Sequence, residues 1–386
     1  MTVATTASVT LRFFDLVVQL SSNDPDALIP FRRLYASFEC AVGDGDDVRL
    51  LVIDYAAPGQ DGIAALTIDG ECWPIASNMQ KTGALYEFIL KYIYAEVQSH
   101  LLIHASVVAL GDYGVLLVGD SGHGKSTLAM TLAARGAGLL SDEVGALDRL
   151  SGEVHWFPRK LRVSRASLSL AGLEEIDRDP EEWFGKTLVD LAKIPGSHPV
   201  RAVPLRAIVF LEDAEPEGKT SNRMNDHLEF IFNRGADSLA RFVKEAISGQ
   251  EFEISEADGL FTLRLEGERI GKVAFEIEKF CRHERICLLD SGSPAERPTR
   301  FDRAPVLAPL AARHAWGRLG QQFLPGRSSR ILRDEFNGAS GPLLLEIMRL
   351  CRGVSFYRLS VGRLAEAVHL IEGLPEPRDP QPSVTG

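Results

Sequence analysis

The chain has 386 residues, 45% of them hydrophobic and 25% charged, and its formal net charge at pH 7 is -11. This composition predicts two or three folded domains, and the negative charge argues against nucleic acid as a partner, because binding to a phosphate backbone depends on clustered Lys and Arg. No apolar run is long enough to span a bilayer and the N-terminal segment lacks a cationic start, so we expect no membrane association.

Residues 1–95 combine strand-like runs with one helical pattern. The strand-like runs are VTLRFFDLVV, VRLLVIDYA and IAALTIDGECWPI, and the helical pattern is TGALYEFILKYIYAEVQSH. They predict a mostly β N-terminal domain that closes on a helix. The runs LLIHASVVAL and YGVLLVG follow, separated by the turn GDYG, and predict two paired strands of one sheet.

The segment from Lys125 to Arg135 predicts a helix, with Leu128 and Leu132 on its buried face and Gly136 placed to stop it. The next run, GLLSDE, predicts a returning strand. Further along, LRAIVFLE predicts a buried strand, DHLEFIFNRGADSLARFVKEAIS a helix, and FEISEADGLFTLRLEG a hairpin. Helical patterns return in GPLLLEIMRLCRG and GRLAEAVHLIEGL, and we expect residues 376–386 to be a disordered tail.

Residues 119–126, GDSGHGKS, form a glycine loop that fits the phosphate-binding pattern G-x-x-x-x-G-K-[ST] between a predicted strand and a predicted helix. Its glycines let successive backbone N–H groups turn inward, and the helix start adds positive potential. Lys125 would reach the β and γ phosphates, and the Ser126 hydroxyl would ligate Mg²⁺. The loop therefore predicts ATP and Mg²⁺ as cofactors, with these nucleotide-binding residues: Gly119, Asp120, Ser121, Gly122, His123, Gly124, Lys125, Ser126 and Thr127.

An acidic pair, Asp142 and Glu143, ends the returning strand. A helix of about eleven residues leads about 16 Å away from the loop, and a parallel strand brings the chain back beside the phosphates. One carboxylate would hold the metal and the other would accept a proton, with the assignment between them open. The alternative is a polar strand end that only caps the next turn.

Several motifs together resemble the HPr kinase/phosphorylase family and its wider set of HPr kinase-like proteins. They are His104 in LLIHASVVAL, the loop GVLLVGDSGHGKSTL and the returning strand in RGAGLLSDEVGAL. Similarity is weaker in VPLRAIVFLE and FYRLSVGRLAEAVHLIE. The resemblance implies an α/β fold with a P-loop kinase core over residues 96–375, related to ATP-type phosphoenolpyruvate carboxykinase, with an insertion at 220–290. It also implies transfer of phosphate to a serine hydroxyl, and a homo-oligomer.

The resemblance also assigns site residues. The family's active-site histidine falls on His104, and its acidic pair, usually two aspartates, falls on Asp142 and Glu143. A later magnesium-binding glutamate of the family has no counterpart. The corresponding region instead offers Arg159 and Arg162, which would bind an acidic substrate or lie on a solvated face. From the strand pattern alone, His104 could equally be a histidine of the core.

The leading hypothesis is a phosphotransferase that uses ATP and Mg²⁺ to phosphorylate serine in a peptide or small protein. The alternatives are a small-molecule kinase of the same fold, decarboxylating phosphotransfer of the carboxykinase type, and a nucleotide-binding scaffold without catalysis. Five scattered cysteines, an odd number, argue against a disulfide framework and predict a cytoplasmic protein.

Overall fold

The structure is a computed structural model, and its contacts divide the chain into two compact units. The first unit is Met1–His100, Thr220–Glu296 and Phe323–Ser340, and the second is Leu101–Lys219, Arg297–Gln322 and Gly341–Gly386. The structure describes residues 6–41, 48–57, 64–75, 84–119, 123–176, 186–212, 227–232, 236–246, 251–257, 260–266, 277, 280, 288–292, 303–320, 322–324, 341–360 and 362–375. The predicted tail at 376–386 lies outside them, and the predicted boundaries at 95 and 375 stay predictions.

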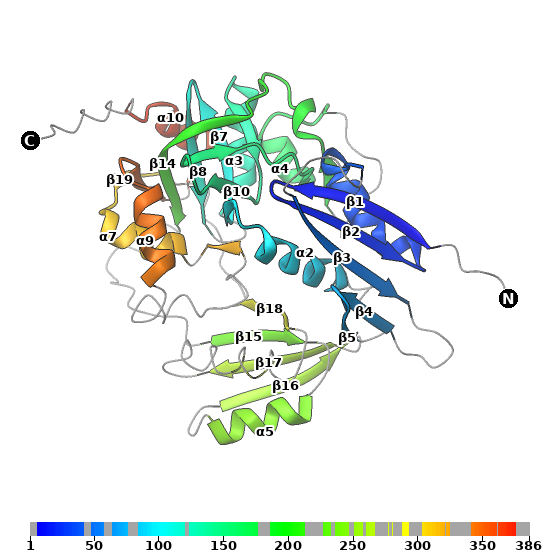
Figure 1. Ribbon diagram of the computed structural model, residues 1–386. Coiled ribbons are helices and arrows are strands. Elements are labelled where there is room, and N and C mark those ends of the chain that lie inside the picture. The colour runs from blue at the N-terminus through cyan, green and yellow to red at the C-terminus, as the bar shows by residue number, and fades with distance from the viewer. Residues whose placement is uncertain are drawn as a thin grey trace, which may run out of the picture. The chain divides into compact units, whose positions relative to one another are not determined.

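The N-terminal part of the first unit is a five-stranded sheet with the strands in chain order (Figure 1). Its strands are β1 (Ala7–Phe13), β2 (Leu16–Ser22), β3 (Arg49–Ala56), β4 (Ala64–Ile68) and β5 (Glu71–Ile75). Only β2 and β3 pair in parallel among these neighbours. Alternate residues Val9, Leu11 and Phe13 of β1 are buried, as expected of a half-buried strand. The helices α1 (Ile29–Leu34) and α2 (Ala84–Glu96) complete this part.

A second sheet of the first unit has the order β16-β17-β15-β18. Its strands are β15 (His227–Phe232), β16 (Glu251–Ala257), β17 (Leu260–Glu266) and β18 (Leu288–Gly292), and the helix α5 spans Ala236–Ala246. The predicted hairpin is confirmed, since β16 and β17 pair antiparallel. The helix predicted over 226–248 is wrong in its first part, because the aromatic and β-branched run HLEFIF pairs with strands on both sides.

The second unit contains a nine-stranded sheet. Seven strands follow the order β6-β10-β11-β14-β8-β7-β9, β20 pairs with β14, and β19 pairs with β20. The strands are β6 (His100–Ile103), β7 (Ala105–Leu110), β8 (Tyr113–Val118), β9 (Gly138–Ser141), β10 (Gly145–Asp148), β11 (Glu153–His155), β14 (Ala202–Glu212), β19 (Leu307–Pro309) and β20 (Ser355–Ser360). The predicted pairing of β7 with β8 is confirmed and is antiparallel, and the predicted buried strand is β14.

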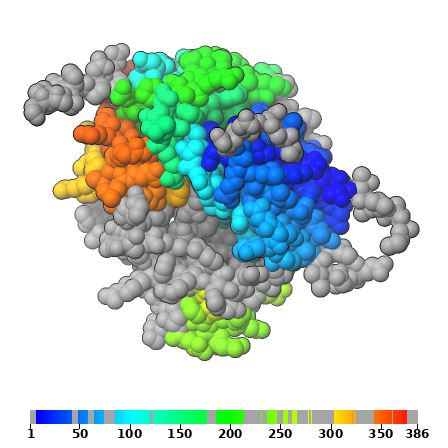
Figure 2. Space-filling view, in the orientation of Figure 1, coloured from blue at the N-terminus to red at the C-terminus, as the bar shows by residue number. Residues whose placement is uncertain are grey.

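Helices and a small two-stranded sheet accompany this sheet. The helices are α3 (Lys125–Ala134), α4 (Arg165–Leu170), α7 (Ala312–Gly320), α9 (Gly341–Leu350) and α10 (Leu364–Glu372). The two-stranded sheet pairs β12 (Leu161–Val163) antiparallel with β13 (Thr187–Val189). The atoms of α7 and α9, yellow and orange in Figure 2, meet on the visible face. The described residues thus form a mixed α/β fold, as predicted. None of the described helices combines the length and apolar character needed to cross a bilayer.

Three consecutive elements position the candidate site. The strand β8 is buried from Gly114 to Val118 and leads into the glycine loop and then α3. In α3, Leu128 and Leu132 are buried as predicted, and Gly136 takes φ 106° just after the helix. The strand β9 pairs antiparallel with β7, which pairs antiparallel with β8. The strands β8 and β9 therefore run in the same direction and end at the same edge, with β7 between them.

Candidate active site

The glycine loop is tightly packed at both of its described ends. A Cβ atom added to Gly119 would lie 2.9 Å from the carbonyl oxygen of Leu211 in β14, closer than real side chains come. Gly124 takes φ 79°, a left-handed conformation that favours glycine, and caps the start of α3. His123 places its Nδ1 3.1 Å from the same Leu211 oxygen. Three predicted nucleotide-binding residues, Asp120, Ser121 and Gly122, lie outside the described residues.

Lys125 is the first residue of α3 and is only 7% exposed. Its Nζ donates a hydrogen bond of 2.7 Å to the carbonyl oxygen of Gly119, at the other end of the loop. The ammonium group therefore lies between the two described ends of the loop, where a phosphate would meet both it and the N-terminal N–H groups of the helix. Ser126 and Thr127 follow in the first turn of α3.

Asp142 lies directly after β9 and is 2% exposed. Its Oδ1 accepts a hydrogen bond from the Ser106 hydroxyl of β7, and its Oδ2 has no hydrogen-bond partner among the described residues. Burial and the neighbouring charge of Glu143 raise the pKa of Asp142, against the opposing effects of hydrogen bonds from Ser106 and Ser126 and of the Lys125 charge. The carboxyl group is thus suited to accepting a proton.

Glu143 has a different backbone conformation and different charged neighbours from Asp142. It has a left-handed backbone with φ 72°, which is uncommon outside glycine. Its carboxylate lies 3.3 Å from Nη1 of Arg159 and 3.9 Å from Nη2 of Arg162. Burial would raise the pKa of Glu143, but the charges of Arg159 and Arg162, then those of His104 and Lys186, lower it to about 2. Glu143 is therefore a fixed negative charge.

The two arginines lie at the site, but not as a solvated face. Arg159 is only 3% exposed as a side chain and Arg162 is 19% exposed. The solvated-face alternative is therefore wrong for Arg159, whose charge is compensated in the interior by Glu143. Charged side chains usually take surface positions. Arg159 can be buried because the carboxylate of Glu143, just after β9, lies beside it.

His104 connects β6 to β7 and is 8% exposed. Its backbone N donates a hydrogen bond of 2.7 Å to the carbonyl oxygen of Gln322. Its charge contributes to the lowered pKa of Glu143, so its ring lies near the acidic pair. The structure therefore brings together His104, the described part of the glycine loop, the acidic pair and the two arginines.

Sequence reasoning missed two participants. Ser106 shares a strand run with His104, and a lone hydroxyl in the apolar run ASVVAL was the available signal. Lys186 lies next to β13 and influences Glu143, yet no motif surrounds it. Its position follows only from the tertiary fold.

The ion pairs of Glu143 predict a pH-dependent contribution to stability. Because folding lowers the pKa of this carboxyl from its ordinary 4.5 to about 2, the stabilisation is complete above about pH 4.5 and is lost as the pH falls towards 2. At pH 7 without divalent metal, Glu143→Gln should lower the free energy of unfolding by about 1–3 kcal/mol, and this difference should shrink between pH 4.5 and 2. Denaturant titrations at several pH values measure it.

The matched control is Glu175→Gln, which alters an exposed glutamate of the same unit. It should change the free energy of unfolding little at any of these pH values. A wild-type minus Glu143→Gln difference that stayed constant from pH 7 to pH 2 would contradict the ion-pair explanation.

Comparisons with known proteins agree with this geometry. Residues 95–227 match the family model described as the HPr Serine kinase C-terminal domain. The HPr kinase/phosphorylase of Lacticaseibacillus casei (strain BL23) is 29% identical over 163 residues, which cover 42% of this chain and 46% of that protein. The HPr kinase/phosphorylase of Chlorobium limicola is 31% identical over 102 residues, which cover 26% of this chain and 31% of that protein. The chain thus spans about half the length, or less, of these curated relatives.

Among solved structures, the Hpr(Ser) kinase/phosphatase from Coxiella burnetii aligns with 48% of this chain and 95% of its own chain, at 16% sequence identity and a TM-score of 0.20. The family model covers His104, the glycine loop, the acidic pair and both arginines. Residues 95–227 thus match the HPr Serine kinase C-terminal domain family, the resemblance that the motifs predicted.

Proposed function

We propose that this protein is a kinase that transfers the γ-phosphate of ATP, with Mg²⁺, to a serine hydroxyl of a peptide or small protein. The observation that carries the proposal is the position of Asp142, buried at the end of β9 beside the glycine-loop residues Lys125 and Ser126. A carboxylate at this place can hold Mg²⁺ or accept the proton of an attacking hydroxyl, and phosphotransfer to a hydroxyl uses both. The core would be a P-loop kinase core of the HPr kinase and phosphoenolpyruvate carboxykinase type.

The residues present fit a magnesium nucleotide. The hydroxyl of Ser126 and the carboxylates of Asp142 and Glu143 are the hard oxygen donors that Mg²⁺ prefers, and Lys125 with the start of α3 offers positive charge to phosphate oxygens. When bound, Mg²⁺ neutralises charge on the phosphates and orients them. The loop amides and Lys125 would stabilise the charge that develops on the moving phosphoryl group.

Geometry distinguishes the two acids. The Glu143 carboxylate is held by Arg159 and Arg162, whereas the Oδ2 of Asp142 has no hydrogen-bond partner among the described residues. We therefore assign proton acceptance from the serine hydroxyl to Asp142. Glu143 would hold the two arginines in place and contribute to the metal site. His104 would lie next to Glu143, on which its charge acts. Arg162, the more exposed arginine, would contact an acidic acceptor.

The test uses ATP labelled on its γ-phosphate and a lysate fractionated by molecular mass. When wild-type protein and Mg²⁺ are present, the proposal predicts label on a polypeptide in one of the lysate fractions, in the form of phosphoserine. Label confined to small molecules would instead support a metabolite kinase of the same fold, and label on nothing would support a nucleotide-binding scaffold. Location in the cytoplasm and homo-oligomeric assembly stay predictions from the sequence.

A further inference from the structure

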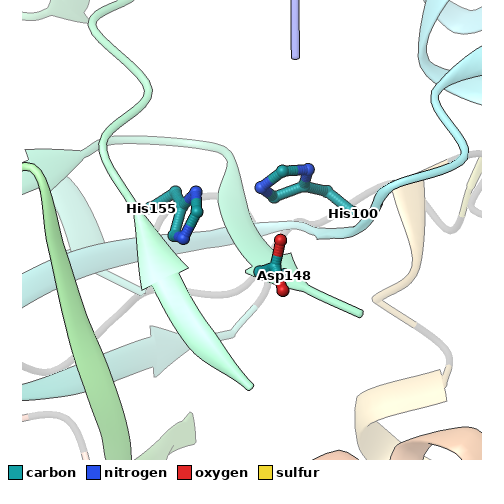
Figure 3. A group of neighbouring side chains, drawn as sticks. All are labelled: His100, Asp148 and His155. Carbon is teal, nitrogen blue, oxygen red and sulfur yellow. The ribbon is translucent and has the colours of Figure 1, made fainter. Parts of the chain in front are cut away.

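We propose that His100, Asp148 and His155 form a binding site for a transition-metal ion of the Zn²⁺ class, separate from the proposed nucleotide site. The three residues come from neighbouring strands of the nine-stranded sheet: His100 begins β6, Asp148 ends β10 and His155 ends β11. One ligand atom from each lies within 4.8 Å of the others, and Figure 3 shows the two rings and the carboxylate turned toward one another.

Strand register explains why Asp148 and His155 share a face. The strands β10 and β11 pair antiparallel with Ala146 opposite His155. Directly opposed residues project to the same face of a sheet, and so do residues two apart on one strand. Because Ala146 and Asp148 are two apart, the side chains of Asp148 and His155 are on one face. The turn between β10 and β11 therefore builds two of the three ligands locally.

The surroundings of His100 prepare its ring for a metal. The Ser99 hydroxyl donates a hydrogen bond of 2.5 Å to Oδ1 of Asp15, and the same oxygen lies 2.7 Å from Nδ1 of His100. Since the hydroxyl proton is directed to Asp15, the Ser99 oxygen accepts a hydrogen bond from Nδ1–H of His100. This arrangement leaves the lone pair on Nε2, the nitrogen that faces the cluster in Figure 3. Metal-bound histidines are commonly oriented in this way, through the nitrogen that does not touch the ion.

Asp148 is fixed in a similar manner. Its Oδ1 accepts hydrogen bonds from the backbone N of Leu150 at 2.9 Å and of Ser151 at 2.6 Å, which orients the second oxygen. Next to His155, the third residue of the cluster, Oε2 of Glu153 lies 3.9 Å from Nε2 of the imidazole ring. A second carboxylate next to the cluster adds negative charge, which favours a cation.

The donor set selects the kind of ion. Two imidazole nitrogens with one carboxylate oxygen suit Zn²⁺, Co²⁺, Ni²⁺ or Cu²⁺, whereas Mg²⁺ and Ca²⁺ take oxygen ligands. Ligand atoms around tetrahedral zinc are about 3.3 Å apart, given bonds of about 2.0–2.2 Å. Small side-chain rotations would close the cluster to that size. The fourth position would be held by water or by the Glu153 carboxylate.

The test is a titration of the full chain, stripped with a chelator, with ZnCl₂ and separately with MgCl₂, followed by calorimetry. The proposal predicts one Zn²⁺ that Mg²⁺ does not displace, with affinity reduced about 100-fold or more in His155→Ala and Asp148→Asn. Ser99→Ala should reduce it by about 10- to 100-fold, as expected when a ligand loses its orienting partner. With Co²⁺ in place of zinc, wild-type protein should show the visible absorption of a tetrahedral site, and His155→Ala should not.

The matched control is His369→Gln, which alters an exposed histidine of α10 outside the cluster and should leave the zinc affinity unchanged. Each variant must keep the wild-type melting temperature in chelator, so that loss of binding reports the site and not unfolding. Equal zinc stoichiometry and affinity in wild type and in both ligand variants, or no zinc binding by wild type at micromolar metal, would overturn the proposal.

Discussion

Lys125→Ala is expected to lower phosphotransfer by about 10³-fold or more while leaving the protein folded. The ammonium group is hydrogen-bonded to the carbonyl oxygen of Gly119, where it would meet the phosphates. Electrostatic stabilisation of the moving phosphoryl group is usually the largest contribution to phosphoryl transfer. Its loss removes the hydrogen bond to Gly119, so the free energy of unfolding should change by about 1 kcal/mol. Initial rates with labelled ATP, together with denaturant titration, measure both effects.

The control for this variant is Lys193→Ala, which removes an exposed lysine of the same unit. It should transfer phosphate at the wild-type rate. Activity of Lys125→Ala within tenfold of wild type would mean that the loop lysine does not contact the transferred phosphate.

Asp142→Asn is expected to lower kcat by about 10²- to 10⁴-fold with nucleotide binding retained, the usual contribution of a general base. The carboxylate lies beside Ser126 and Lys125 with one oxygen bonded to Ser106, and an amide cannot take up the hydroxyl proton. Glu143→Gln should have a smaller effect on kcat and should raise the Mg²⁺ concentration needed for half-maximal rate. Steady-state kinetics at varied Mg²⁺ distinguish the two variants.

Similar rates for wild type and Asp142→Asn would remove Asp142 as the base. If Glu143→Gln instead showed the large loss in kcat, the roles of the two acids would be exchanged. His104→Ala belongs in the same assay, since an unchanged rate would make His104 a histidine of the core.

The sequence predicted the parts of this site that depend on neighbouring residues. The run from β8 through the glycine loop to α3 has a continuous local signal: a buried strand, glycines where the backbone turns left-handed, and Leu128 and Leu132 on one helix face. The direction of the returning strand β9 follows from the length of α3. These features are decided within about thirty residues of chain, where periodicity and turn chemistry apply.

Other features depend on pairings between distant segments. Burial of Arg159 requires Glu143 beside it, and the bond from Ser106 to Asp142 requires β7 to lie between β8 and β9. The segment 227–232 has aromatic and β-branched residues that suit either a helix face or a strand, and only pairing on both sides makes it β15. Long-range contacts of this kind override local propensity.

Binding of ATP at the glycine loop is measured by calorimetric titration of the wild-type protein with ATP, with and without Mg²⁺. We expect saturable binding of about one nucleotide per chain that is stronger with Mg²⁺ and is lost in Lys125→Ala. Absence of a binding signal from wild-type protein at millimolar ATP and Mg²⁺ would contradict it.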